Sequence, residues 1–131
     1  MFQLSTLSRK NASCSDLLRC VFGIKDFEER LIYIMARRGR STLDELASET
    51  SRDRSTVHRA LSKLLSLELC YRNVTSLRGG GYVHEYSLMD VESIGRNIRQ
   101  RIDELKESLD SLTDNFENDI RHNIIGALHV D

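Results

Sequence analysis

The sequence predicts a mainly α-helical fold that carries one β-hairpin and ends in a long helix. Three observations predict it. Apolar residues recur at helical spacing in several short, capped segments between residues 15 and 66. The apolar period then changes to two on both sides of a glycine-rich turn. From residue 91 onward, apolar residues follow a heptad-like spacing in a chain that contains no proline.

The N-terminal part is predicted to contain two helices. Residues 1–13 show no clear period, and we expect them to begin without regular structure. A short helix starts with Ser15 or Asp16 as its cap, and a longer one starts with Asp26 as its cap and stops at Gly39. We assign residues 1–24 to an extension with this short helix. The apolar stripe of the longer helix consists of Phe27, Leu31, Ile34 and Met35.

The next two helices form a helix-turn-helix pattern. Ser41 or Thr42 caps the first and pairs with Glu45 in a capping box, and Asp53 caps the second. The apolar face of the second helix consists of Val57, Ala60, Leu61 and Leu64. The opposite face consists of Arg54, Ser55, His58, Arg59, Ser62 and Lys63. Half of these six residues are basic and none is acidic.

A hairpin follows directly. Leu69–Thr75 and Tyr82–Leu88 are rich in β-branched and aromatic residues, and a turn with Arg78 before three glycines joins them. The alternation indicates that Tyr86 packs on the helices, whereas Tyr82 lies near the tip. With this hairpin, residues 25–88 are predicted to form a winged helix-turn-helix domain.

Residues 89–131 are predicted to form a long helix with a narrow apolar stripe, which is typical of a coiled coil. The stripe consists of Val91, Ile94, Ile98, Ile102, Leu105, Leu109, Leu112 and Phe116. No other segment is long enough to cover it, so we expect it to dimerise with the same helix of a second chain. Residues 120–128 either extend this helix or fold back as a small closing helix.

The formal net charge of −1 hides an asymmetry along the chain. Residues 1–88 contain 14 Lys and Arg against 10 Asp and Glu, whereas residues 89–131 contain 5 against 10. Binding to phosphate depends on the local patch that faces it, so the basic front part weakly favours nucleic acid as the partner. The near-neutral total argues against unspecific coating of DNA.

The remaining composition points away from membranes and from catalysis. No uncharged stretch approaches the roughly 20 residues that span a bilayer, and the N-terminus lacks the order of a signal peptide, so we expect a cytoplasmic protein. No nucleotide loop, nucleophile elbow or metal-ligand spacing occurs, so we expect no enzyme, no cofactor and no metal. Cys14, Cys20 and Cys70 are either small buried side chains or a thiol switch.

A winged helix-turn-helix predicts binding to double-stranded DNA, because one helix enters the major groove while the wing grips phosphate. The residues expected to bind DNA are Arg52, Arg54, Ser55, Thr56, His58, Arg59, Lys63, Arg72, Arg78, Gly80 and Tyr82. Among these, Arg54, Ser55, His58 and Arg59 are expected to reach base edges, and Thr56, Lys63 and Arg72 to contact phosphate.

Several alternatives stay open at this point. Asp53 is a helix cap or an acceptor for cytosine, Arg72 contacts phosphate or pairs with Glu85, and Arg78 enters a minor groove or belongs to a loose turn. A protein-interaction module without sequence-specific DNA binding is the alternative function.

At these residues the chain resembles the TrmB-like and MarR-like winged-helix transcription regulators, in particular short archaeal ones. The resemblance covers Asp26–Leu88. It rests on the motifs E-x-x-x-Y-x-x-x-x-x-G (Glu29, Tyr33, Gly39), T-x-x-E-L-A (Thr42 to Ala47), R-S-T-V-x-R-A-L-x-x-L (Arg54 to Leu64), L-x-x-R (Leu69 to Arg72) and G-G-x-x-x-x-Y (Gly80 to Tyr86).

The resemblance implies a homodimer that reads a palindromic operator, and we expect a repressor. The sequence departs from the family in two respects. Family members usually have glycine where Glu68 stands, so the recognition helix is expected to end differently here. Full-length TrmB proteins carry a sugar-binding domain where this chain has a helix, so sugar sensing is not implied. The operator and any small-molecule or redox effector are not identified by the sequence.

Overall fold

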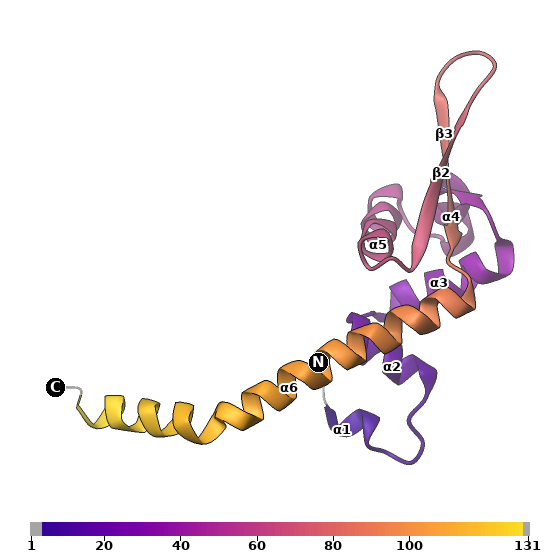
Figure 1. Ribbon diagram of the computed structural model, residues 1–131. Helices are drawn as coiled ribbons and strands as arrows, with labels where there is room; N and C mark the ends of the chain where they lie inside the picture. The colour runs from indigo at the N-terminus through magenta and orange to yellow at the C-terminus, as the bar shows by residue number, and fades with distance from the viewer. Residues whose placement is uncertain (1–3, 130–131) are drawn as a thin grey trace. The chain divides into compact units, whose positions relative to one another are not determined.

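The computed structural model describes residues 4–129 and divides into two compact units, residues 1–97 and residues 98–131. Its helices are α1 (Leu4–Leu7), α2 (Cys14–Phe22), α3 (Asp26–Arg38), α4 (Leu43–Thr50), α5 (Arg54–Ser66) and α6 (Val91–Leu128). Its strands are β1 (Ser41–Thr42), β2 (Cys70–Ser76) and β3 (Tyr82–Leu88). Helix α6 begins in the first unit, and its greater part forms the second (Figure 1).

The N-terminal helices differ from the prediction in their starts. A short helix, α1, lies within residues 1–13, where no regular structure was expected, and residues 1–3 lie outside the described part. Ser13, and neither Ser15 nor Asp16, is the cap of α2, since its hydroxyl accepts from the backbone N–H of Asp16. The carboxylate of Asp16 in turn accepts from the backbone N–H of Ser13, which completes a capping box.

Helix α3 also starts one residue earlier than predicted, because its cap is Lys25 and not Asp26. Asp26 is its first helical residue, and the backbone N–H of the preceding Lys25 donates to Glu28 at 2.8 Å. A buried carboxylate, that of Glu29, joins α3 to α2 because it accepts from the hydroxyl of Ser15 and from Arg19 Nη2 at 2.9 Å. Two such charge-assisted bonds satisfy a carboxylate that burial would otherwise destabilise.

The core of the first unit lies between α3, α4 and α5. The side chains that are buried there or nearly so are Leu31, Ile34 and Met35 of α3, Leu46 of α4, and Val57, Ala60, Leu61 and Leu64 of α5. All were predicted as inward-facing from their helical spacing. Leu69 and Tyr86 close this core from the hairpin side, with 1% and 5% of their surfaces exposed.

The sheet has three strands in the order β1–β3–β2, all antiparallel. The two long strands begin and end within one residue of their predicted limits, and they project from the helices as a wing (Figure 1). Strand β1 was not predicted, because two residues carry no detectable period. Its pairing of Ser41 with Tyr86 joins the segment between α3 and α4 to the wing.

The C-terminal helix α6 is continuous from Val91 to Leu128, so residues 120–128 extend it and do not fold back. Asp90 caps its start and accepts from the backbone N–H and the hydroxyl of Ser93, and the hydroxyl bond lowers the pKa of this carboxyl. Within the second unit the stripe residues Leu105, Leu109, Leu112 and Phe116 are exposed. None of the described helices is long and apolar enough to cross a membrane.

Helix α5 ends at Ser66, and the second residue after it, Glu68, has a positive φ of 60°. The backbone N–H of Glu68 donates to the carbonyl of Leu65 at 3.0 Å, and that of Leu69 donates to Leu64 at 2.9 Å. The chain thus makes a left-handed turn of the kind that favours glycine although a side chain is present, so the expectation that the helix ends differently because Glu68 is not glycine is wrong.

Replacing Glu68 with glycine is expected to raise the free energy of unfolding by about 1 kcal/mol, because a side chain in the left-handed region costs roughly that much. Urea unfolding followed by circular dichroism measures the difference. Glu68→Ala is the matched control, since alanine removes the carboxylate and keeps the strain. Equal midpoints for the two variants would show that backbone strain at this position is unimportant.

A second prediction concerns Cys70, which is buried. Burial raises the pKa of its thiol to about 11. The stabilisation from burying the neutral thiol is fully present below the pKa that this thiol has in the unfolded chain. It is lost as pH rises toward the folded-state pKa of about 11. Between pH ~9 and ~11, the free energy of unfolding is expected to fall by up to about 3 kcal/mol more in the natural chain than in Cys70→Ala. Parallel curves for the two proteins would contradict this.

Candidate nucleic-acid interface

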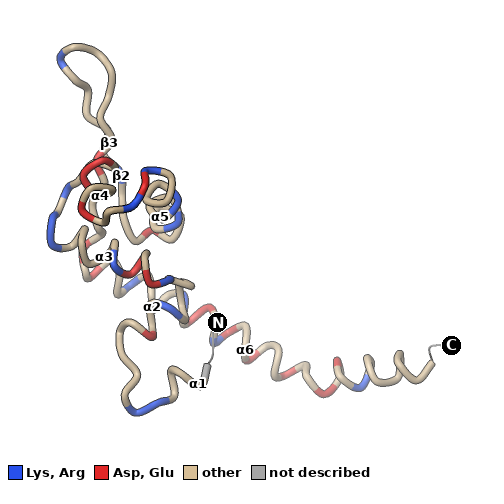
Figure 2. The backbone as a smooth tube through the Cα atoms, turned by 180° about the vertical axis from the view of Figure 1, so that it is seen from behind, with Lys and Arg blue, Asp and Glu red and all other residues tan. Residues whose placement is uncertain are grey.

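The outward face of α5 carries the residues that were predicted to read bases. Arg54, Ser55, His58 and Arg59 are all exposed, because the buried Val57, Ala60, Leu61 and Leu64 occupy the opposite face. Figure 2 shows Lys and Arg along α5 and acidic residues along the neighbouring α4. The exposed face of α5 is therefore basic and rich in hydrogen-bond donors.

The turn before α5 is held by side chains. Asp53 occupies the cap position, and its carboxylate accepts a short hydrogen bond from the hydroxyl of Thr56, which lowers the pKa of Asp53. Arg59 Nη2 donates to the same hydroxyl at 3.4 Å. The Asp53 carboxylate makes no side-chain cap hydrogen bond to the backbone, so the choice between a capping role and contact with cytosine stays a prediction.

Two shallow hollows lie against this face of α5. One, of about 330 Å³, is lined by Arg54, Ser55, His58 and Arg59 of α5 together with Leu43. The other, of about 410 Å³, is lined by Thr42, Leu43, Asp44, Arg54, His58, Arg72, Tyr82, Val83, His84 and Tyr86. The second hollow joins α5, the start of α4 and the base of the wing. We call the residues of both hollows the α5–wing surface.

Six residues of the α5–wing surface were missing from the predicted set, and two of them, His84 and Asp44, carry side chains that can be charged. His84 lies opposite Val74 in the hairpin and lines the larger hollow. Asp44, from the first turn of α4, forms an ion pair with Arg54. The alternation of the strand placed His84 on the same face as Tyr82, whereas no sequence signal connected Asp44 with Arg54, ten residues away.

The register of the hairpin decides the surroundings of Arg72. Arg72 lies opposite Tyr86, whereas Glu85 lies opposite Asn73 and therefore on the other face. Arg72 is exposed on the face that lines the larger hollow, beside His58 and Tyr82. This placement favours an Arg72 that is available to an external anion over the alternative of a pair with Glu85.

Two predicted residues lie elsewhere. Lys63 Nζ donates to the carbonyl of Gly23 at 2.7 Å and to Glu28 at 2.8 Å, so it joins α5 to the α2–α3 junction. This pairing uses the charge of Lys63 inside the fold and argues against the expected phosphate contact, which stays a prediction. The guanidinium of Arg52 stacks over the ring of Phe27, 4.8 Å from its centroid.

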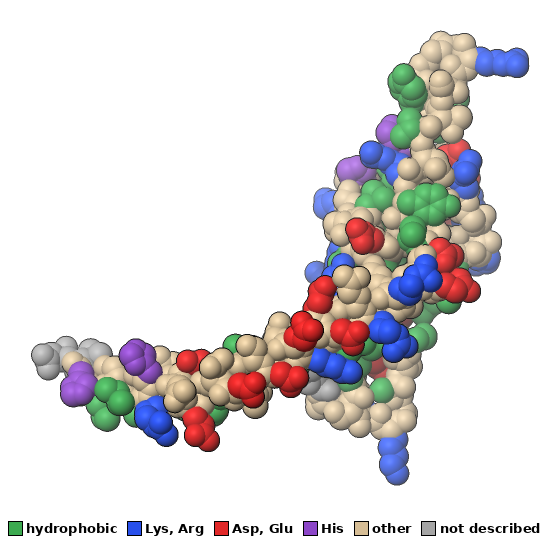
Figure 3. Space-filling view, viewed as in Figure 1, with side chains coloured by type: hydrophobic (Ala, Val, Ile, Leu, Met, Phe, Trp, Pro, Cys, Tyr) green, Lys and Arg blue, Asp and Glu red, His purple; other side chains and the backbone are tan. Residues whose placement is uncertain are grey.

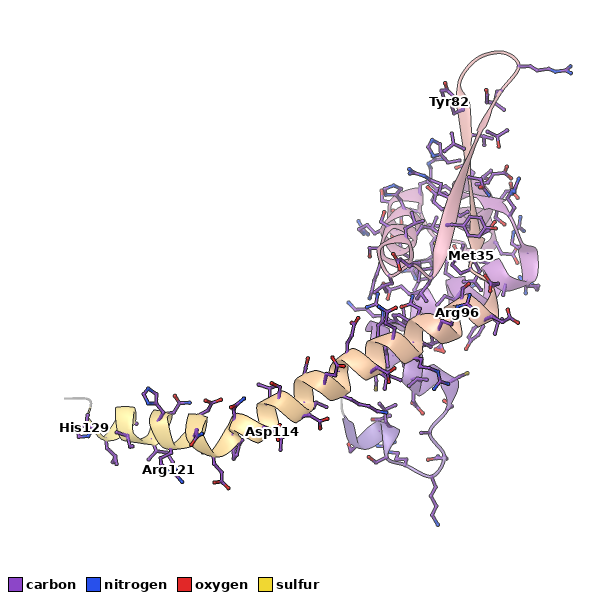
Figure 4. All side chains as sticks on the ribbon, viewed as in Figure 1. Met35, Tyr82, Arg96, Asp114, Arg121 and His129 are labelled. Carbon is purple, nitrogen blue, oxygen red and sulfur yellow. The ribbon has the colours of Figure 1, made fainter. Side chains whose placement is uncertain are left out.

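The turn residues 77–81 at the tip of the wing line neither hollow, although the next residue, Tyr82, lines the larger one. The backbone N–H of Gly80 donates to the carbonyl of Leu77, and both Gly80 and Gly81 have positive φ values, of 93° and 83°, which explains the glycines. Arg78 and Leu77 are exposed in this turn. Tyr82 is 71% exposed near the tip, as Figure 4 shows.

The cysteines and acidic residues offer no second kind of site among residues 4–129. No group of three or more His, Cys, Asp or Glu side chains is placed to hold a metal ion there. Cys70 is buried and its pKa of about 11 disfavours the reactive thiolate, whereas Cys14 is exposed. A thiol switch at Cys70 is therefore disfavoured by its surroundings.

Comparison with known proteins identifies the family. Residues 18–92 match the family described as the sugar-specific transcriptional regulator TrmB. This chain belongs to the TrmB family.

Two uncharacterized proteins of Methanocaldococcus jannaschii are similar in sequence. MJ1503 is 32% identical over 88 residues, which cover 67% of each chain. MJ1082 is 28% identical over 95 residues, which cover 72% of this chain and 78% of the relative.

One solved structure is similar in fold. It is a possible transcriptional regulator from Methanosarcina mazei Go1, with a TM-score of 0.70 at 21% identity, and the match covers 83% of this chain and 95% of that chain. This likeness supports the winged-helix fold.

Membership in the TrmB family makes this protein a DNA-binding transcriptional regulator and agrees with the prediction that it is not an enzyme. The element order explains how the family function is carried: a bracing helix α4, an exposed basic helix α5, and a wing of β2 and β3. The α5–wing surface is the part of the described chain that combines all three.

Replacing Asp44 with asparagine is expected to raise the affinity for every duplex several-fold, because it removes a negative charge that faces the approaching phosphates and engages Arg54. Titration of labelled duplexes at low salt, followed by fluorescence anisotropy, measures this. Glu68→Gln is the matched control, since it removes one exposed carboxylate that lines neither hollow. Equal gains in both variants would mean that only the net charge matters.

Proposed function

We propose that this TrmB-family protein is a homodimeric repressor that reads an inverted-repeat operator. Each subunit places α5 in a major groove and the wing beside the adjacent backbone. Two-fold symmetry of the protein requires two-fold symmetry of the operator, with half-sites about 10 base pairs apart or a multiple of that. Occupying such a site at a promoter blocks transcription by exclusion.

The observation that carries the proposal is the exposed face of α5. Arg54 and Arg59 project from its first two turns with Ser55 and His58 between them, and the described face has no carboxylate of its own. Arginine recognises the O6 and N7 atoms of guanine with two parallel hydrogen bonds, and serine and histidine adapt to several bases. We assign base reading to these four residues.

Phosphate contacts are assigned to the surroundings of α5. Thr56 lies at its first turn, and Arg72 lies at the base of the wing on the face that lines the larger hollow. Arg52 lies just before α5, where its stacking on Phe27 fixes the direction of its guanidinium. These residues position α5 and carry little sequence information themselves.

The wing tip is assigned to a minor groove. Gly80 lets the backbone turn closely, Arg78 supplies one positive charge, and Tyr82 lies directly beyond the turn. A narrow minor groove has an enhanced negative potential that attracts an inserted arginine. The wing therefore adds affinity without contacting base edges.

Dimerisation is assigned to α6. Its stripe residues Val91, Ile94, Ile98, Ile102, Leu105, Leu109, Leu112 and Phe116 are exposed or only partly buried in the single chain. An apolar stripe of this length at heptad spacing is stabilised when a second helix covers it. The simplest second helix is that of an identical chain.

The base-reading assignment predicts that the loss of affinity depends on the DNA sequence in Arg59→Ala but not in Arg78→Ala. Arg59→Ala should cost ~1–3 kcal/mol on the operator and relax the preference at one base pair, whereas Arg78→Ala should weaken operator and random duplexes by the same factor. The operator is first selected from a random duplex library, and both affinities are then measured at two salt concentrations.

Arg30→Ala is the matched control, since this exposed arginine of α3 lines neither hollow of the α5–wing surface. It should leave operator binding nearly unchanged. A uniform loss in both Arg59→Ala and Arg78→Ala would contradict base reading by α5. Selection that enriches no sequence would favour a protein-interaction module instead.

A further inference from the structure

The larger hollow of the α5–wing surface gathers side chains that can carry positive charge. Arg54 and His58 line it from α5, Arg72 from β2 and His84 from β3. Figure 3 shows histidine side chains beside Lys and Arg where α5 meets the wing. Asp44 of α4 is the only carboxylate among the described residues that line the hollow. This composition makes the hollow a candidate site for an anion.

The negative charge of Asp44 is already used. Asp44 forms an ion pair with Arg54, so the two together contribute no net charge to the hollow. Glu85 does not replace it, because the register places Glu85 on the other face of the hairpin. Among residues 4–129, no carboxylate forms an ion pair with Arg72 or with either histidine. The positive side of the hollow therefore lacks a counter-charge within the fold.

The register of the hairpin brings Arg72 and His84 together. Arg72 lies opposite Tyr86 and His84 lies opposite Val74, so the two are diagonal neighbours on one face. Diagonal neighbours in antiparallel strands are about 7–8 Å apart, within reach of long side chains. Both residues are exposed. One oxyanion can therefore accept hydrogen bonds from the guanidinium and from the imidazole together.

The protonation of His84 depends on the charges that face it. The titratable groups around the hollow are Asp44 of α4, Arg54 and His58 of α5, Arg72 of β2, and Tyr82 and Tyr86 of β3. Apart from the paired Asp44, none of these groups is negative at neutral pH. An anion in the hollow adds the negative charge that this set lacks, and a negative neighbour favours the protonated imidazole.

The DNA duplex supplies such an anion. The hollow lies beside the exposed face of α5, and backbone phosphates border the major groove that such a helix enters. The hydroxyls of Thr42 and Tyr82 line the same hollow and can donate to phosphate oxygens. Free inorganic phosphate offers the same chemistry, so the two sources have to be separated by experiment.

We propose that the larger hollow holds one backbone phosphate of the duplex between Arg72 and a protonated His84, so that DNA binding takes up a proton. The inference rests on the proposed docking of α5 in the major groove. It adds His84 as a DNA contact and makes the affinity depend on pH. A phosphate contact is independent of base sequence, so the effect is expected on every duplex.

Proton uptake determines the sign of the pH dependence. The complex holds more protons than the separate protein and duplex, so the affinity rises as pH falls, by at most about tenfold per pH unit for one proton. Histidine changes its charge between pH ~5 and ~8, which defines the range to measure. Glutamine keeps a hydrogen-bond donor and takes up no proton. His84→Gln therefore removes the proton uptake with little change in shape.

The test compares the natural chain with His84→Gln on the selected operator and on a random duplex, at pH ~8 and pH ~6. Ionic strength is held constant in buffers without phosphate. We expect nearly equal affinities at the higher pH, and several-fold tighter binding by the natural chain at the lower pH, on both duplexes. His58 is present in both proteins, so the difference isolates His84. Equal unfolding midpoints confirm that the substitution leaves the fold intact.

His122→Gln is the matched control, since this exposed histidine of α6 lines neither hollow. It should follow the natural chain at both pH values. Calorimetry in two buffers that differ in enthalpy of ionisation counts the protons taken up on binding. The count should be lower for His84→Gln than for the natural chain and for the control.

Inorganic phosphate tests the second source of the anion. It is added to the complex and compared with chloride at equal ionic strength. We expect phosphate to displace the duplex no better than chloride does. Stronger displacement by phosphate from the natural chain, but not from His84→Gln, would assign the hollow to a free anion and overturn the inference.

The same pH dependence in the natural chain and in His84→Gln would also overturn the inference. A gain at low pH on the operator alone would give His84 a base contact in place of a phosphate, with the same consequence. In each of these cases the natural chain still selects an operator, so the proposed function stands. A natural chain that binds no duplex, or prefers none, would refute the proposed function itself.

Discussion

The burial of one face of α5 is the constraint on which the rest of the DNA-binding unit depends. Val57, Leu61 and Leu64 have no exposed surface, because α3, α4 and the base of the wing surround them. A helix that buries positions 57, 61 and 64 must present 55, 58, 59 and 62 to solvent. The ion pair from Lys63 to Glu28 then holds the distal part of α5 in place. Packing thus determines which side chains reach the groove.

Most of the fold could be predicted because its signals are local. Helical spacing, capping residues and the change to period two placed α3, α4, α5 and the wing within a few residues.

The features of the fold that the sequence did not predict were missed for physical reasons. Ser13 was missed as a cap because Ser15 and Asp16 are equally suitable by type, and Lys25 was missed because lysine is not a favoured cap whereas the next residue, Asp26, is. Strand β1 exists only because Ser41 reaches Tyr86 across forty-five positions, which no local pattern records. Glu68 takes the turn that glycine usually takes because adjacent backbone bonds at Leu65 and Leu69 hold it.

The candidate site was only partly predictable, since charge pairing is a tertiary property. The sequence indicated which α5 residues face outward, and it assigned Arg54 and Arg59 to bases and Lys63 to phosphate, but it did not indicate which of them are paired inside the fold. The structure separates them: Arg59 is oriented by Thr56, Arg54 is engaged by Asp44, and Lys63 is used internally. No periodicity of α5 distinguishes Arg54 from Lys63, because their partners Asp44 and Glu28 come from other helices. The hollow beside the wing likewise depends on the hairpin register, which the turn type alone did not specify.

The wing carries exposed apolar surface as well as charge. Val74, Leu77 and Tyr82 are each more than half exposed, and Val74 and Tyr82 share the face on which His84 lies. When such surface leaves water, the heat capacity of the system falls, whereas pairing of guanidinium groups with phosphate has no such signature. Complex formation by this regulator should therefore grow more exothermic as temperature rises, to an extent that measures how far the wing enters the groove.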